Sequence, residues 1–74
     1  MAAGFVHTVF KNGQWVNEVE GGEELGSGYA TKEDAIAAGR DRADRDKTEH
    51  LIHNQDGTIS QRNSYGGDPE SRTG

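Results

Sequence analysis

The sequence predicts a small α+β domain with the order strand-strand-helix-strand-strand, an antiparallel sheet and one helix packed on one face of that sheet. Two turn signals of the hairpin type, Asn12-Gly13 and Asp56-Gly57, lie between segments that read as strands. Between the two hairpins, Thr31 precedes a segment in which apolar residues recur at helical spacing. These three observations predict the fold class.

The 74 residues allow one domain with one small core, because a chain of this length buries only about 60% of the surface that its unfolded state exposes. We assign this domain to residues 5–65, with residues 1–4 as a flexible N-terminus and residues 66–74 as a loose C-terminal tail. The chain has no cysteine, which excludes a disulfide framework, a thiolate zinc site and a cysteine nucleophile.

The formal net charge of -5 at pH 7 opposes binding to nucleic-acid backbones and to anionic lipid, because the long-range field repels both. No apolar stretch approaches the length that a bilayer requires, and the first residues lack a basic segment followed by a long apolar run. We therefore expect a cytoplasmic protein without a membrane partner.

The first hairpin is expected to join a strand over residues 5–10 to a strand over residues 15–19. A two-residue loop at Asn12-Gly13 sets the register, because both residues tolerate the positive φ that this turn needs. The predicted pairs are Phe10 with Trp15, Thr8 with Asn17, and Val6 with Val19, which places both apolar pairs on the core face.

The segment after the hairpin is expected to be a flexible connection over residues 21–28, since it is rich in glycine. A helix over residues 32–47 should follow, with Thr31 as its N-cap and Asp34 at the third helical position. The buried side of this helix consists of small residues, so the helix can lie close to the sheet: Ala35, Ile36, Gly39 and Ala43.

The second hairpin is expected to join a strand over residues 51–54 to a strand over residues 58–62 through Asp56-Gly57. In either plausible loop length, Ile52 and Ile59 share a face. The predicted core is Val6, Phe10, Trp15, Val19, Ala35, Ile36, Ala43, Ile52 and Ile59.

The face of the sheet opposite the helix is more apolar than a solvated face needs to be, and one helix covers only one side. We interpret this open face as a contact surface for another protein or for a second copy. Its predicted residues are His7, Val9, Val16, Leu51 and His53.

Several short motifs resemble those of a family of small bacterial domains catalogued as domain of unknown function 2188. They are His7-Thr8-Val9, Asn12-Gly13 with Trp15-Val16, Thr31-Lys32 with Asp34-Ala35, Leu51-Ile52-His53 with Asp56-Gly57, and the closing Asn63-Ser64-Tyr65-Gly66-Gly67-Asp68-Pro69. The resemblance covers residues 7–69, and the closing segment departs from the family's ending at Asn63 and Gly67. It implies a fold pattern and no activity, so function has to be argued from sites.

The three histidines are the side chains whose charge changes near neutral pH. His50 and His53 are three residues apart on a predicted strand and therefore point to opposite faces, so they cannot share a metal ion. His7 and His53 would lie together if their strands are neighbours, and Glu18 or Asp56 could add a carboxylate. Because no compact ligand motif is present, we predict no metal site and no cofactor.

Nucleic-acid binding is an alternative, because a small sheet can enter a groove or stack against bases. The candidate contacts are Lys11, Arg62 and Tyr65, with three arginines on the helix. Each helix arginine has an aspartate beside it, a pattern that is typical of a solvated face. For Tyr65, a packing role in a closing loop and a binding role both remain open.

Catalysis is not expected, because the chain lacks a nucleophile paired with a base and is too small to enclose a water-excluding pocket. The glycine-rich segment also lacks the lysine of a phosphate loop. The leading interpretation is a non-enzymatic interaction module that forms a homodimer or binds a protein partner through its open sheet face or an edge strand. Nucleic-acid binding is the second hypothesis, and a metal-dependent role through the sheet histidines is the third.

Overall fold

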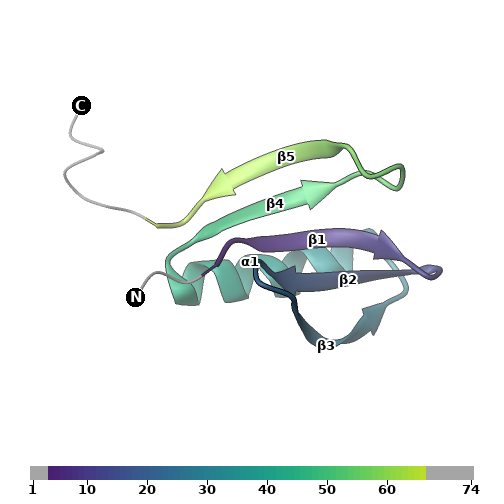
Figure 1. Ribbon diagram of the computed structural model, residues 1–74, viewed down its shortest axis with the longest axis horizontal. Coiled ribbons are helices and arrows are strands. Elements are labelled where there is room, and N and C mark those ends of the chain that lie inside the picture. Colours follow the sequence, from purple (N-terminus) through teal and green to yellow (C-terminus); the bar gives the residue numbers. More distant parts are fainter. Residues whose placement is uncertain (1–3, 67–74) are drawn as a thin grey trace.

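The computed structural model describes residues 4–66, which form one five-stranded mixed sheet with one helix (Figure 1). The strands stand in the order β3-β2-β1-β4-β5; β1 and β4 are parallel, and the other neighbours are antiparallel. Most of the predicted N-terminus and most of the predicted tail, residues 1–3 and 67–74, lie outside the described residues. The elements in chain order are β1 (Val6–Lys11), β2 (Gln14–Val19), β3 (Glu23–Tyr29), α1 (Lys32–Asp46), β4 (Glu49–His53) and β5 (Ile59–Ser64).

The α+β class with one helix is confirmed, but the predicted strand count and the wholly antiparallel sheet are wrong. The glycine-rich segment is β3, which pairs antiparallel with β2 instead of forming a flexible connection. Glycine and glutamate have low strand propensity, and pairing with an existing strand overrides that local preference. Because β3 runs in the same direction as β1, the helix that follows it returns the chain to the end of the sheet where β1 starts. From there β4 runs parallel to β1.

The register of the first hairpin is confirmed: Val6 faces Val19, Thr8 faces Asn17 and Phe10 faces Trp15. The turn has φ of 52° at Asn12 and 81° at Gly13, as a two-residue hairpin loop of this type requires.

The predicted helix is confirmed within one residue. Thr31 is the N-cap, and its Oγ1 accepts a hydrogen bond of 3.2 Å from the backbone N–H of Asp34. Lys47 adopts the left-handed conformation that ends the helix, and its N–H donates back to the last turn. The helix packs over β1, β2 and β4 and touches β3, but makes no close backbone approach to β5.

The predicted core is only partly right. Val6, Ala35, Ala43 and Ile52 are buried as predicted. The side chains of four further predicted core residues are only half-buried: Phe10, Trp15, Val19 and Ile36.

Ile59 is 54% exposed, so its assignment to the core is wrong. A register shift between Ile52 and His53 places Ile59 opposite His53, on the face away from the helix, while Ile52 faces Gln61. One extra residue in a strand reverses the faces of all residues beyond it, which is the physical reason for the error.

Polar side chains occupy the centre of the layer between helix and sheet: Thr8, Asn17 and His50 are all at most 2% exposed. Gly39 of α1 lies directly above them, where a Cβ atom would be 2.6–2.9 Å from a polar atom of each. The helix can therefore rest on the sheet only because position 39 has no side chain.

Candidate functional site

The five residues of the predicted contact surface all lie on the open face of the sheet, opposite α1. His7 and Val9 stand in β1, level with Leu51 of β4 and Val16 of β2, respectively. Val16 is only 4% exposed and Leu51 only 7%, so the apolar centre of this face is shielded by its neighbours. The accessible members of the set are the half-buried His7, Val9 and His53.

His7 and His53 form a close pair on this open face. His7 Nδ1 lies 3.0 Å from His53 Nε2, and the ring centroids are 5.2 Å apart. The two strands that carry them are neighbours, which was the condition under which the sequence placed the rings together. His50, on the same strand as His53, points to the helix side, as period-two geometry predicts.

Each ring of the pair has a second polar partner on its far side. His7 Nε2 lies 3.5 Å from Glu20 Oε2, and His53 Nδ1 lies 3.2 Å from the backbone oxygen of Gly57. The two rings line an open depression of about 350 Å³, together with Val9, Glu18, Val19, Glu20, Gly21 and Gly22.

The carboxylates that the sequence suggested for this pair are engaged elsewhere. Glu18 accepts a hydrogen bond of 3.0 Å from Lys11 Nζ. Asp56 accepts hydrogen bonds from the N–H and the hydroxyl of Thr58, which lower its pKa. Glu20 takes their place beside His7. Within residues 4–66, no group of three or more His, Cys, Asp or Glu side chains is arranged to hold a metal ion.

His50 is fully buried and belongs to a chain of hydrogen bonds beneath the helix. Its Nε2 lies 2.7 Å from Thr8 Oγ1, whose hydroxyl donates to Asn17 Oδ1 at 2.5 Å. Asn17 Nδ2 donates in turn to the backbone oxygen of Ala35 at 2.9 Å. Because the Thr8 proton points to Asn17, His50 Nε2 must be the donor of its bond, and Nδ1 carries a lone pair.

The buried Nδ1 of His50 has no hydrogen-bond partner in the described part of the chain. Burial lowers the pKa of His50, and the positive charge of Arg40 lowers it further. Residue parity in β4 could have revealed this role, since His50 shares the face of Ile52. The ring is therefore a neutral structural element and not a surface ligand.

The predicted nucleic-acid contacts are not brought together. Lys11 pairs with Glu18 and lies 3.8 Å from Glu24, while Arg62 Nε donates to Glu49 Oε1 at 2.6 Å. These partners raise the pKa of both cations and neutralise their charge locally. Arg62 is level with His7 across the sheet, whereas Lys11 lies four residues farther along β1.

Tyr65 follows the end of β5, and its N–H donates to the backbone oxygen of Thr48. Strand parity places its side chain on the face opposite that of Arg62. Its half-buried ring fits the interpretation as part of a closing loop.

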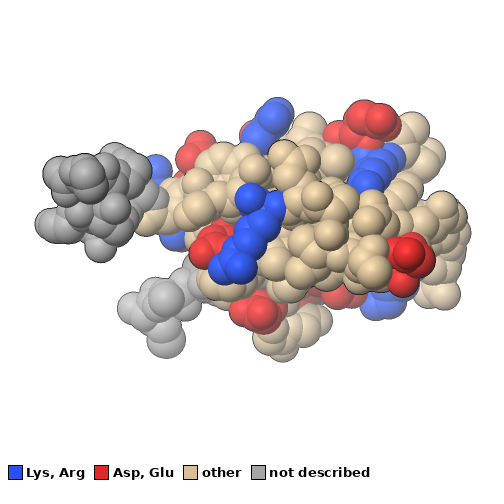
Figure 2. All heavy atoms as spheres, turned by 90° about the horizontal axis from the view of Figure 1, so that it is seen from above, with Lys and Arg blue, Asp and Glu red and all other residues tan. Residues whose placement is uncertain are grey.

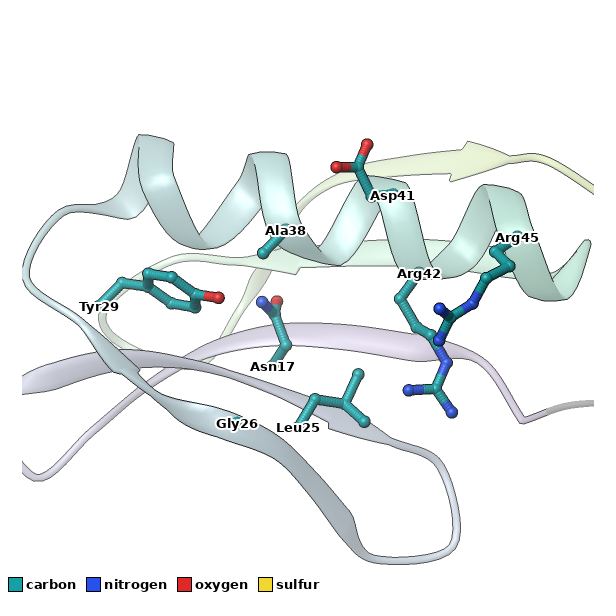
Figure 3. A pocket seen from close by; sticks show the side chains of 8 residues that line it. All are labelled: Asn17, Leu25, Gly26, Tyr29, Ala38, Asp41, Arg42 and Arg45. Carbon is teal, nitrogen blue, oxygen red and sulfur yellow. The ribbon is translucent and has the colours of Figure 1, made fainter.

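A second hollow lies between α1 and the β2–β3 hairpin and measures about 320 Å³ (Figure 3). Tyr29 points its hydroxyl into this cleft toward Asn17, and Arg42 and Arg45 reach down from the helix toward Leu25. Arg42 is paired with Asp46 at 2.7 Å. The described residues that line the cleft include no serine, cysteine, histidine or lysine.

No helix within residues 4–66 is long and apolar enough to cross a membrane. No curated protein and no solved structure gives a significant match to the chain. A family model does match, over residues 6–65, and it describes an uncharacterized protein conserved in bacteria. On the basis of this match, which covers every strand and the helix, the chain belongs to the bacterial family of domain of unknown function 2188.

Proposed function

We propose that this domain is a non-enzymatic interaction module that forms a homodimer through the edge strand β5. The observation that carries the proposal is the exposure of β5: five of its six residues are exposed and Asn63 is half-buried. Within residues 4–66 the strand pairs only with β4 and lies beyond the reach of α1, so no other described element covers either of its faces or its outer edge. In Figure 1, β5 stands apart from the helix at the edge of the sheet.

The two edges of the sheet differ in how well they are protected against pairing. β3 begins with Glu23 and Glu24, contains two glycines and has an irregular register with β2. Charge and irregularity of this kind discourage the addition of another strand. β5 carries a single charge, that of Arg62, which is neutralised by Glu49. Viewed from the side of β5, the surface is mostly uncharged and its ionic groups are scattered (Figure 2). β5 is therefore the edge that is open to a partner strand.

The backbone of β5 offers hydrogen-bonding groups at known positions. The N–H of Tyr65 donates inward to Thr48 of the neighbouring chain segment. Since successive residues of a strand point their N–H groups to alternate sides, Asn63 also points inward and Arg62 and Ser64 point outward. The outward N–H and C=O groups of these two residues are the ones that a second strand would use.

A second copy of β5 fits this edge when the two strands run antiparallel about Gln61. In that register the side chain of Gln61 lies opposite Gln61 of the second copy, and the side chain of Arg62 lies opposite Ser60 of the second copy. The two positive charges are then offset, whereas a register centred on Arg62 would place them in opposition. The self-complementary register supports a symmetric dimer as the occupant of this edge.

The test compares Arg62→Pro with Arg62→Ala by sedimentation equilibrium over a concentration series. Both variants lose the ion pair with Glu49, but only proline removes the outward N–H and adds a ring at the edge. We expect the wild type and Arg62→Ala to rise from 8.0 kDa toward twice that mass, and Arg62→Pro to remain monomeric. Ser64→Pro, on the same outward side, should have the same effect.

Amide spectra of each variant establish that the fold is retained before the masses are compared. A wild type that stays monomeric up to millimolar concentration would show that the homodimer proposal is wrong. Association of Arg62→Pro as strong as that of the wild type would show that backbone pairing at β5 is not the mode of assembly.

A further inference from the structure

The cleft between α1 and the β2–β3 hairpin lies beside a bulge in β3. The register of β3 with β2 shifts between Trp15 and Asn17, so residues 26–28 of β3 lie opposite a single residue of β2. Gly26 adopts the left-handed conformation there, with φ of 62°. A bulge bends its strand, and the hollow of about 320 Å³ opens where β3 bends (Figure 3). This volume falls at the lower end of the range of small-molecule sites, about 300–1,000 Å³.

Part of the cleft lining is apolar and suits the body of a small organic molecule. Leu25 and the ring of Tyr29 come from β3, and Ala38 comes from α1. All three side chains are half-buried. A ligand that covers them removes apolar surface from water, which favours its binding.

The helix contributes two positive charges to the same cleft. Arg42 and Arg45 are three residues apart on α1, so they project from the same side of the helix, and Figure 3 shows both side chains reaching toward β3. Arg42 donates to Asp46 through Nε, and its terminal nitrogens have no acceptor among the described residues. Arg45 has no ion-pair partner within residues 4–66. The guanidinium groups therefore retain donors for an anionic group.

The other polar groups of the cleft agree with an anionic ligand. Asp41 is among the lining residues, but its carboxylate points away from the cleft (Figure 3). The hydroxyl of Tyr29 points into the cleft and has no hydrogen-bond partner in the described part of the chain, so its proton is free for a ligand. Guanidinium and hydroxyl donors together complement the oxygens of a carboxylate or a phosphate.

We propose that this cleft binds a small organic anion, whose carboxylate or phosphate group pairs with Arg42 and Arg45 and whose apolar body lies against Leu25 and Tyr29. The net charge of -5 repels a polyanion at long range, so a compact ligand with one anionic group fits better than a nucleic acid. The cleft borders β3, the edge of the sheet opposite β5, and is independent of pairing at β5.

Titration of the nitrogen-labelled full chain with phenyl phosphate and, separately, with benzoate tests the proposal. Near neutral pH and at low salt, we expect saturable shifts of the Gly26 and Tyr29 amides and of the Arg45 Nε–H group. The probe that binds more tightly identifies the preferred anionic group. Benzyl alcohol has a similar body without the charge, and it should bind at least about tenfold more weakly.

Three variants separate the cleft from the charge of the helix as a whole. Arg45→Gln should weaken binding of the better probe by about tenfold, because it removes a charge-assisted hydrogen bond. Arg40→Gln is the matched control: it removes the same charge from an exposed position of α1 that does not line the cleft, and it should bind as the wild type does. Tyr29→Phe keeps the ring and should weaken binding by a few-fold through loss of the hydroxyl.

Three results would overturn the proposal. The first is the absence of shifts at Gly26 and Tyr29 with both anionic probes at millimolar concentration. The second is equal binding of benzyl alcohol and the anionic probes, which would show that the cleft does not select a charge. The third is an equal loss of affinity in Arg45→Gln and Arg40→Gln, which would assign the effect to the general field of the helix.

Discussion

Gly39 of α1 lies directly against the ring of His50 in β4. A Cβ atom at position 39 would be 2.7 Å from His50 Nε2 and 2.6 Å from Asn17 Oδ1, both far inside normal contact distance. The polar cluster of Thr8, Asn17 and His50 thus fills the space that a side chain of the helix would otherwise take. Four predictions follow from the packing of this layer and from the strand that borders it.

Replacing Gly39 by alanine is expected to destabilise the domain. Alanine favours a helix over glycine by about 1 kcal/mol, but overpacking of a rigid core costs typically 1–3 kcal/mol. The atoms that the new methyl group would meet belong to short, mutually bonded side chains that cannot move aside. Urea unfolding should show a net loss of about 1–2 kcal/mol. Ala37→Gly, at an exposed helix position, measures the propensity difference alone, and a more stable Gly39→Ala would contradict the packing described here.

The stability of the domain is expected to fall with acidification because of His50. Burial lowers its pKa in the folded state below the unfolded value of 6.5. Between these two pKa values the unfolded chain binds more protons, so the free energy of unfolding decreases as the pH falls below about 6.5 and levels off below the folded pKa. Chemical denaturation at pH 7.5 and at pH 5.5 measures the change. His50→Gln should reduce this pH dependence. An unchanged dependence in the variant would show that the protonation of His50 is not its cause.

Removal of the Thr8 hydroxyl is expected to break the hydrogen-bond chain in two places. Thr8→Val retains the shape but leaves His50 Nε2 and Asn17 Oδ1 without this partner in a buried site. Each unsatisfied buried group costs about 1–3 kcal/mol, so we expect a loss of at least roughly 2 kcal/mol in denaturant unfolding. Thr8→Ser keeps the hydroxyl and loses only a methyl group. A Thr8→Val variant as stable as the wild type, with a loss only in Thr8→Ser, would show that the methyl group, and not the hydrogen bonds, stabilises this position.

Ile52 and Ile59 are expected to respond very differently to the same substitution. Ile52 is 3% exposed, and Ile52→Ala should cost about 2–5 kcal/mol through lost burial and the cavity left behind. Ile59 is 54% exposed, and Ile59→Ala should change the free energy of unfolding by about 0.5 kcal/mol or less. Thermal and urea unfolding of the pair check the register shift in β5, and a large loss at Ile59 would place that residue in the core after all.

The histidine pair shows which parts of the candidate site can be predicted from residue spacing alone. Period-two spacing assigned His7 and His53 to one face and separated His50 from them, and all three assignments agree with the structure. The contact between the two rings depended on β1 and β4 being neighbours, which no local feature reveals. Glu20 was missed as a partner because it lies beyond the predicted end of the strand at Val19, although its N–H still donates to Phe5 O and its parity with Glu18 places it on the face of His7.

The sequence by itself determined the elements whose signals are local. The Asn12-Gly13 turn specified the register of β1 with β2, because turn geometry decides which residues face each other. Thr31 and Asp34 specified the start of α1 through a hydrogen bond between residues three apart. Only the tertiary structure decided that a glycine-rich segment becomes β3, that β4 lies parallel to β1, and that Ile59 faces away from the core. These outcomes depend on contacts between residues distant in the chain, whose free energy exceeds the weak local preferences of strands.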